Sequence, residues 1–496
     1  MIQQSIATPV SQACNLIIFG AKGDLARRKL IPALYQLEKI NAIHPDTFIL
    51  GIGRAEWDIS IYIEVIRSAL EMFMKESIQE SIWHRFINRF DFCNLDVNQI
   101  EKFTYIINKL RCLELLTISY LAMPPHTFGL ICQGLSFIGL NKKLNRIVIE
   151  KPLGTNLSSA KLINMQVAKY FHESQVYRVD HYLGKETVLN LLALRFANSL
   201  FFSNWDRNII DHVQITIAEE IGIEGRWGYF DAIGQMRDMV QSHLLQILTI
   251  IAMSPPVDLS ADSIRDEKVK VLRALRIIQP NKINEVAVRG QYTSGILQGQ
   301  TVPGYLEELG ANKYSNTETF VAIRVNIDNW RWFGVPFYLR TGKRLAIKSS
   351  EIVIYFKRPI INIFSESCKY LPNNKLIIRL QPDEGINMQI LIKVPGFGHK
   401  HCLQIVNLNS SFGKSFYKDC LIGAYERLLL ETMRGVQILF VRRDEVESSW
   451  KWVDSVMKAW ALDSSMPKLY QAGTWGPEES LEMILRENRD WNNYIY

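Results

Sequence analysis

Apolar residues in the first third of the chain form short runs separated by longer stretches with helical spacing. The runs occupy residues 15–19, 47–52, 116–122 and 146–149. Between them, leucines recur at helical intervals from Leu25 to Leu37, and an amphipathic stretch covers residues 59–92. An alternation of strand and helix predicts a parallel sheet with crossover helices. We therefore expect an N-terminal α/β domain of the Rossmann-like kind.

Beyond about residue 200, polar and apolar positions alternate over longer segments joined by short polar connections. These segments are 212–218, 319–327, 351–356, 375–380 and 388–394. Helical spacing interrupts them at 237–252, 262–275 and 424–436. The pattern predicts a C-terminal α+β domain with a large, mostly antiparallel sheet. We place the domain boundary between 175 and 200, which gives domains of residues 1–185 and 186–496.

The length and composition of the chain restrict the class of protein. A chain of 496 residues exceeds the size of one hydrophobic core, so two or three domains are expected. The net charge of +7 is modest, and no run of five basic residues occurs, so we expect no nucleic-acid partner. The apolar stretch at 244–253 is too short to span a bilayer, so we expect no membrane partner either.

The cysteines and the N-terminus bear on location. The seven cysteines are odd in number, and no two have CxxC spacing. This favours free thiols in a reducing compartment. The first 13 residues lack the basic and apolar regions of a secretory signal. We therefore expect a cytoplasmic protein.

A glycine-containing turn follows the first predicted strand. The turn reads Gly20-Ala21-Lys22-Gly23-Asp24-Leu25-Ala26-Arg27 and opens a predicted helix. Gly20 permits a tight turn, Gly23 lets the backbone approach a pyrophosphate, and the helix N-terminus offers free N–H groups. The spacing is GxxG, so a purely structural strand-turn-helix is an alternative interpretation.

The end of the second strand bears on the choice of coenzyme. NAD sites usually place Asp or Glu there to bind the ribose 2′-hydroxyl. Here Arg54 follows the strand, and Lys22 adds positive charge. A guanidinium suits the 2′-phosphate, which favours NADP. An exposed arginine at a strand end is also common, so Arg54 alone is a weak signal.

Three further segments carry candidate chemistry. Lys151 follows the strand at 146–149, where ligands bind in open α/β sheets. Residues 178–186 concentrate cationic and acidic side chains, and His181 and Lys185 lie four residues apart. This spacing suits a small polyanion near a helix start, although a surface turn is possible. On a predicted helix, His243 has the titration range of a general base, yet helix histidines are often structural.

These segments together resemble the glucose-6-phosphate dehydrogenase family, especially its bacterial type. The resemblance runs from about residue 12 to the C-terminus and rests on motifs in the family's order. The motifs are the turn at 20–27, EKPLG at 150, RVDHYLGKE at 178, EGRWGYFD at 224, RDMVQSHLLQ at 237, RTGKR at 340 and AGTWGP at 472. The resemblance implies oxidation of glucose 6-phosphate to 6-phosphoglucono-1,5-lactone with NADP, the first oxidative step of the pentose phosphate pathway. It also implies a homodimer or homotetramer.

The resemblance assigns a role to each matching position. His243 matches the base that removes the C1 hydroxyl proton, and Asp180 matches the carboxylate that orients this base. The implied phosphate and sugar ligands are Lys151, His181, Tyr182, Lys185, Glu219, Asp238, Lys343 and Lys348. The implied coenzyme ligands are Gly20, Ala21, Lys22, Gly23, Asp24, Leu25, Ala26, Arg27, Arg54 and Lys151. Nicotinamide carries the redox chemistry, so no metal is expected.

The chain differs from the family pattern at two positions, and two other functions are possible. Lys22 stands where many relatives have Ser, and Phe128 where some have Tyr. The first rival is an NADP-linked dehydrogenase of an unphosphorylated hexose, which would leave the cations at 181, 185 and 348 without an anion. The second rival is a non-catalytic coenzyme-binding sensor, which would leave His243 and Asp180 unexplained.

Overall fold

The computed structural model describes residues 10–395, 402–412 and 423–493. The chain divides into two compact units, each discontinuous in sequence. The first unit contains residues 1–186, 256–266 and 419–447, and the second contains 187–255, 267–418 and 448–496. The sequence pattern placed everything after residue 185 in one C-terminal domain, whereas two later segments return to the first unit.

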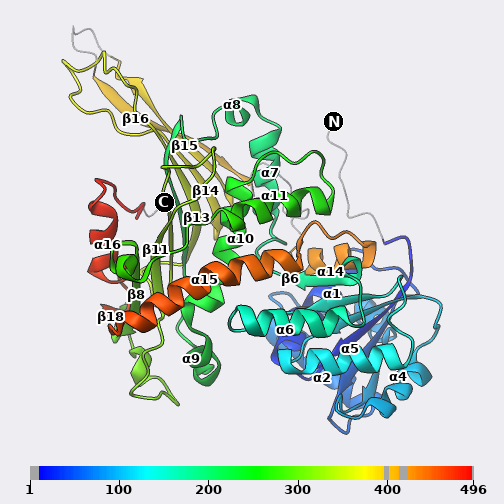
Figure 1. Ribbon diagram of the computed structural model, residues 1–496. Coiled ribbons are helices and arrows are strands. Elements are labelled where there is room, and N and C mark those ends of the chain that lie inside the picture. The colour runs from blue at the N-terminus through cyan, green and yellow to red at the C-terminus, as the bar shows by residue number, and fades with distance from the viewer. Residues whose placement is uncertain (1–9, 396–401, 413–422, 494–496) are drawn as a thin grey trace. The chain divides into compact units, whose positions relative to one another are not determined.

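The first unit is built on a seven-stranded sheet in the order β17-β6-β5-β4-β1-β2-β3 (Figure 1). Six strands are parallel, and only β17 is antiparallel to its neighbour β6. The strands are β1 (Cys14–Phe19), β2 (Phe48–Gly53), β3 (Phe90–Asn94), β4 (Leu116–Leu121), β5 (Arg146–Ile149), β6 (Val176–Val179) and β17 (Phe440–Val441). The continuous apolar runs of β1 and β4 are buried along their whole length, as parallel strands covered on both faces require. The expected Rossmann-like sheet is therefore confirmed.

Helices connect these strands and bury both faces of the sheet. They are η1 (Ala26–Leu30), α1 (Ile31–Lys39), α2 (Ile59–Phe73), α3 (Glu80–Ile87), η2 (Ile100–Phe103), α4 (Thr104–Lys109), η3 (Pro125–Thr127), α5 (Phe128–Phe137), α6 (Leu157–Ala168), η4 (Glu173–Gln175) and α14 (Ala424–Arg434). One continuous apolar core joins α4, α5 and α6 to residues such as Ile17, Phe19 and Leu50. Phe128 is fully buried in this core.

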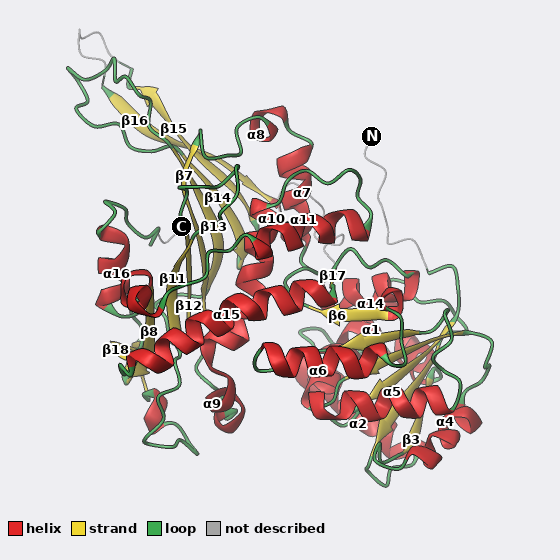
Figure 2. Ribbon diagram, viewed as in Figure 1, coloured by secondary structure: helices red, strands yellow, loops and turns green. Residues whose placement is uncertain are grey.

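The second unit is built on a nine-stranded sheet in the order β16-β15-β14-β13-β7-β12-β11-β8-β18 (Figure 2). The strands β9 and β10 form a separate two-stranded sheet. Only the pairs β7–β12 and β8–β18 are parallel, so the expected mostly antiparallel sheet is confirmed. The strands are β7 (Ile210–Ala218), β8 (Ala287–Thr293), β9 (Gly295–Leu297), β10 (Gln300–Val302), β11 (Phe320–Val325), β12 (Phe337–Gly342), β13 (Ser349–Phe356), β14 (Lys375–Gln381), β15 (Gly385–Lys393), β16 (Leu403–Ser411) and β18 (Lys468–Gln471).

Several helices belong to the second unit or include a point at which the chain passes from one unit to the other. They are α7 (Glu186–Phe196), α8 (Ser199–Phe202), α9 (Trp227–Gln235), η5 (Met236–Leu244), α10 (Leu245–Ala252), α11 (Ala261–Arg273), η6 (Pro280–Lys282), α12 (Ile283–Val286), η7 (Tyr305–Glu307), α15 (Arg443–Asp463) and α16 (Glu478–Leu485). Within the described ranges, none of the helices has the length and apolar composition needed to cross a bilayer.

Two sequence-based expectations on secondary structure need correction. The amphipathic stretch at 59–92 is not one helical region, because it contains α2, α3 and the start of β3. The helix expected at 237–252 is π-helical from Met236 to Leu244 and becomes α-helical only at Leu245. The backbone of a π-helix pairs residues five apart rather than four. The expected common face of Asp238, Ser242 and Gln246 applies to an α-helix.

Candidate coenzyme and substrate sites

The turn after β1 has a geometry that only glycine permits. Gly20 has a φ of +85°, and a Cβ there would lie 2.3 Å from the carbonyl oxygen of Ala122. The Gly20 and Ala21 amides both donate to the Ile52 carbonyl at 3.0 Å, and the Gly23 amide donates to the Gly20 carbonyl at 2.8 Å. The turn is thereby fixed between the carboxyl ends of β2 and β4, where open parallel sheets bind their ligands.

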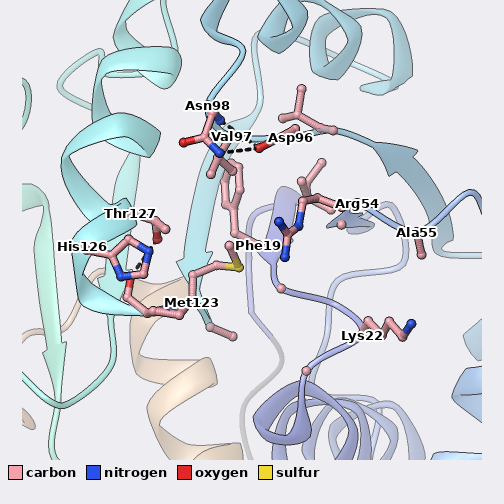
Figure 3. Close-up of a pocket in the computed structure, with 17 residues that line it drawn as sticks. Phe19, Lys22, Arg54, Ala55, Asp96, Val97, Asn98, Met123, His126 and Thr127 are labelled. Carbon is pink, nitrogen blue, oxygen red and sulfur yellow. Dashed lines mark hydrogen bonds between the residues drawn. The ribbon is translucent and has the colours of Figure 1, made fainter.

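A cavity of about 610 Å³ lies beside this turn (Figure 3). Gly20, Lys22, Gly23 and Arg54 line one part of it. In Figure 3 the Arg54 side chain points toward Phe19 and Met123, whereas the Lys22 side chain points away from them. Its size is that of a small-molecule site. Both cationic side chains are exposed, which leaves them accessible to an anionic group.

The remaining residues of the turn are placed differently. Ala21 and Ala26 are buried, whereas Asp24 is exposed and forms a 2.6 Å ion pair with Arg28. The Nε of Arg27 is buried and has no hydrogen-bond partner within the described part of the chain. An anion bound at the turn would supply such a partner, so the donor set fits a phosphate-bearing coenzyme.

Sequence reasoning missed two segments that line the same cavity. Residues 95–98 follow β3, and residues 122–127 follow β4. Figure 3 shows Asp96, Asn98, Met123 and Thr127 from these two segments around the cavity. The signal was available for residues 122–127, because they follow the strand predicted at 116–122, and ligands bind at the edge where such strands end. Residues 95–98 carried no such signal, because β3 was not predicted.

Residues 180–185 form a compact turn between β6 and α7. Asp180 Oδ1 accepts a hydrogen bond of 3.0 Å from the Tyr182 amide, and the Leu183 amide donates to the Asp180 carbonyl at 3.0 Å. The ammonium of Lys185 lies 3.8 Å from the centre of the Tyr182 ring. The expected helix begins at Glu186, so His181 and Lys185 lie in the turn that precedes it.

Helix α14 supports this turn from a distant part of the sequence. The His181 ring stacks on Tyr425 with ring centres 6.3 Å apart. Arg427 forms an ion pair with Glu186. A Cβ on Gly184 would lie 2.8 Å from the Ala424 carbonyl oxygen, so the close approach of α14 explains why this position is glycine.

In the second unit, Glu219 and Lys343 lie at the carboxyl ends of the parallel strands β7 and β12. Ala218 pairs with Gly342, so the next residue of each strand meets the other. Lys343 Nζ donates to Glu219 Oε2 at 2.9 Å, and Lys343 is 4% exposed. The Tyr470 hydroxyl donates to the Lys343 carbonyl at 2.7 Å. This pair offers adjacent donors and acceptors for hydroxyl groups, whereas Lys348 is exposed on the segment before β13.

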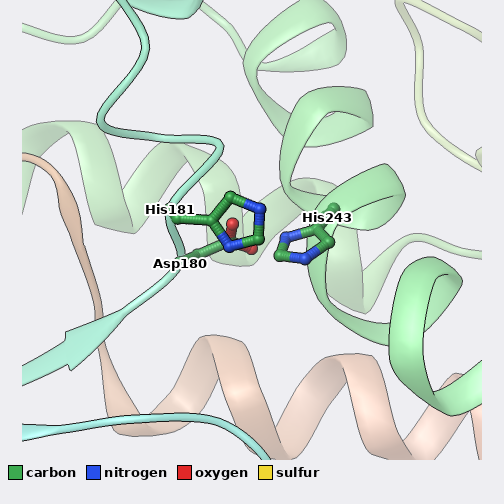
Figure 4. Close-up of side chains that lie close together, drawn as sticks. All are labelled: Asp180, His181 and His243. Carbon is green, nitrogen blue, oxygen red and sulfur yellow. The ribbon is translucent and has the colours of Figure 1, made fainter. Parts of the chain in front are cut away.

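His243 lies on the π-helical segment η5 and is fully buried. Figure 4 draws it on this helix, and draws Asp180 and His181 on the segment that follows β6. The start of η5 is fixed by Glu318, which accepts a 3.0 Å hydrogen bond from the Met236 amide. Gly234, at a φ of +73°, is needed there because a Cβ would lie 2.5 Å from Glu318 Oε1. Desolvation raises the pKa of the Glu318 carboxyl.

Two family models together match most of the chain. A family model for the NAD-binding domain of glucose-6-phosphate dehydrogenase matches residues 17–190, and a model for its C-terminal domain matches 192–492. The chain belongs to the glucose-6-phosphate dehydrogenase family. The glucose-6-phosphate 1-dehydrogenase of Dickeya dadantii is 67% identical over 98% of this chain and 99% of its own. One from Buchnera aphidicola subsp. Schizaphis graminum is 54% identical over the same shares.

Solved structures of this dehydrogenase family have the same fold. A glucose-6-phosphate dehydrogenase in complex with its substrate has a TM-score of 0.88 at 33% identity, covering 98% of this chain and 100% of that one. The Mycobacterium avium enzyme has a TM-score of 0.86 at 34% identity, covering 98% and 99%. The similarity therefore includes both units rather than the coenzyme domain alone.

Proposed function

We propose that this chain oxidises D-glucose 6-phosphate to 6-phospho-D-glucono-1,5-lactone and reduces NADP, the first oxidative step of the pentose phosphate pathway. The observation that carries the proposal is the 67% identity to a glucose-6-phosphate 1-dehydrogenase across nearly the whole of both chains. Bound NADP supplies a nicotinamide that accepts the hydride from C1. A hexose dehydrogenase and a non-catalytic sensor are not favoured by these relatives.

In the proposed reaction, His243 removes the proton of the C1 hydroxyl. An imidazole suits this step, because its ordinary pKa lies closer to neutral pH than that of any other side chain. The Asp180 carboxylate orients the ring and stabilises the imidazolium that forms. These residues lie in different units, so the proposal includes that they meet in the working enzyme.

The other predicted ligands divide by chemistry. His181, Tyr182 and Lys185 share one turn and hold the phosphate, together with Lys348. Glu219, Asp238 and Lys343 hold sugar hydroxyls, since the ion pair of Glu219 and Lys343 offers both acceptors and donors. Lys151 bridges substrate and coenzyme, while Arg54 and Lys22 hold the 2′-phosphate beside the turn at 20–27.

The domain roles, oligomeric state and location are part of the proposal. We assign coenzyme binding to residues 1–185, and substrate binding and oligomerisation to 186–496. The outer strands β15 and β16 carry exposed apolar side chains at Ile392, Ile405 and Leu408, which supports a homodimer or homotetramer. The six described cysteines form no disulfide among themselves, which supports the cytoplasm. Light scattering after size-exclusion chromatography would measure the oligomer.

Steady-state assays of NADPH formation test the activity. We expect kcat/KM for glucose 6-phosphate to exceed that for glucose by about a thousandfold or more, because only glucose 6-phosphate offers the cationic side chains a phosphate group. Equal rates with both sugars would favour the hexose dehydrogenase. Coenzyme binding without turnover of either sugar would favour the sensor.

A further inference from the structure

A buried carboxyl group lies at the carboxyl end of β5, next to Lys151. Glu150 is 7% exposed, and its Oε1 accepts a hydrogen bond of 2.5 Å from the Tyr120 hydroxyl. Tyr120 pairs with Val148 across β4 and β5. Since side chains alternate along a strand, Glu150 continues on the face of Val148 and meets the Tyr120 side chain.

The charged and titratable groups around Glu150 come from four elements of the first unit. They are Tyr120 on β4, Lys151 after β5, Asp180 after β6 and Tyr425 on α14. Burial raises the pKa of Glu150 from 4.5 to about 7, the proximity of Asp180 adds to this, and the Tyr120 hydroxyl and Lys151 oppose it. Burial also raises the pKa of Tyr120 well above its ordinary value, so its hydroxyl remains a donor at neutral pH.

A structural role alone does not explain a carboxyl group at position 150. A buried carboxyl group is costly to ionise, and glutamine would satisfy one tyrosine hydroxyl equally well. The neighbours of Glu150 are instead two groups of the proposed site, the Lys151 ammonium and the Asp180 carboxylate. An ionised Glu150 places a second negative charge beside Asp180. In the proposed reaction, this charge would raise the pKa of the imidazole that Asp180 orients.

We propose that Glu150 is a positioning residue of this reaction, whose carboxylate is held by Tyr120, orients Lys151 and adds negative charge behind Asp180. The inference rests on the proposed function. It deepens that function by adding a carboxyl group whose ionisation contributes to the acid side of the pH profile. Because Glu150 and Asp180 interact, the pH profile reports pKa values of the coupled groups rather than of one residue.

Two variants test the proposal because they should shift the acid limb of kcat/KM in opposite directions. Glu150→Gln removes the negative charge beside Asp180, so the pKa of the catalytic imidazole should fall and the acid limb should move to lower pH. We expect kcat to fall about tenfold. Tyr120→Phe removes a hydrogen bond that lowers the pKa of Glu150. The acid limb should therefore move to higher pH, by roughly one unit.

The double variant Glu150→Gln/Tyr120→Phe supplies the decisive comparison. Without the carboxyl group, loss of the Tyr120 hydroxyl should move the acid limb no further than Glu150→Gln alone. Tyr177→Phe is the matched control, since Tyr177 is a buried tyrosine on the adjacent strand β6 and should leave the limb in place. Circular dichroism and Tm would show that each variant is folded.

The outcomes separate this inference from the proposed function. If both single variants keep the wild-type acid limb, or both shift it equally in one direction, Glu150 has only a structural role. If the wild-type protein does not oxidise glucose 6-phosphate, the proposed function fails first. Turnover by the wild type with opposite shifts in the two variants supports both.

Discussion

The change Gly20→Ala tests the coenzyme turn most sharply. Gly20 has a φ of +85°, a conformation that costs an ordinary residue about 1–2 kcal/mol. The added Cβ would also lie 2.3 Å from the Ala122 carbonyl oxygen, a backbone atom that cannot turn aside like a flexible side chain. Either the turn or the segment after β4 must move, and both line the cavity.

Gly139→Ala provides the control for this change. Gly139 has a φ of +74°, and no atom lies within 4 Å of its Cβ position. Alanine at position 139 therefore has the free-energy cost of a positive φ but no steric clash at its Cβ. For a unit of this size, about 1–2 kcal/mol lowers Tm by about 2–8 °C, and we expect this loss for Gly139→Ala with the KM for NADP unchanged.

For Gly20→Ala, we expect a larger loss of Tm and a rise of at least about tenfold in the KM for NADP, equivalent to about 1.4 kcal/mol. Differential scanning fluorimetry and initial rates of NADPH formation, at saturating glucose 6-phosphate, measure the two quantities. Equal Tm values for the two variants, with an unchanged KM for NADP in Gly20→Ala, would refute the argument from close approach.

The remaining predictions concern catalysis and coenzyme choice. His243→Asn should lower kcat by roughly two to four decades while the KM for glucose 6-phosphate changes little, because only the proton acceptor is lost; a near-normal kcat would remove the base assignment. Arg54→Ala should raise the KM for NADP much more than that for NAD, because only NADP has the 2′-phosphate; equal effects on both coenzymes would contradict this. Glu219→Gln should raise the KM for glucose 6-phosphate and leave that for NADP unchanged, since Glu219 pairs with Lys343 rather than lining the cavity at the turn; a selective loss of NADP affinity would contradict it.

Much of the fold was predictable because apolar runs and alternations have direct structural causes. The run at 146–149 coincides with β5, and the alternation at 351–356 lies within β13. The stretch at 59–92 failed because the short strand β3, with only five residues, follows two amphipathic helices closely. The π-helical segment at 236–244 could not be read from periodicity, since the choice between π and α hydrogen bonding depends on packing.

The candidate site was predictable where the chemistry lies in local motifs. The turn at 20–27 lies beside a cavity, and the segment at 180–185 forms a compact turn. Contacts between distant segments were not predictable. Tyr425 stacks on His181, and Tyr120 donates to Glu150, only because α14 and the strand register bring them together. The spacing of residues along the sequence predicts neither contact.

Glucose 6-phosphate carrying deuterium at C1 tests the central claim most directly. After incubation with NADP, mass spectrometry of the reduced coenzyme shows whether the deuterium from C1 has been transferred to it. Direct hydride transfer predicts NADPH one mass unit heavier, formed in step with the lactone. Unlabelled NADPH with deuterium released to water, or no reduction of NADP, would contradict the account.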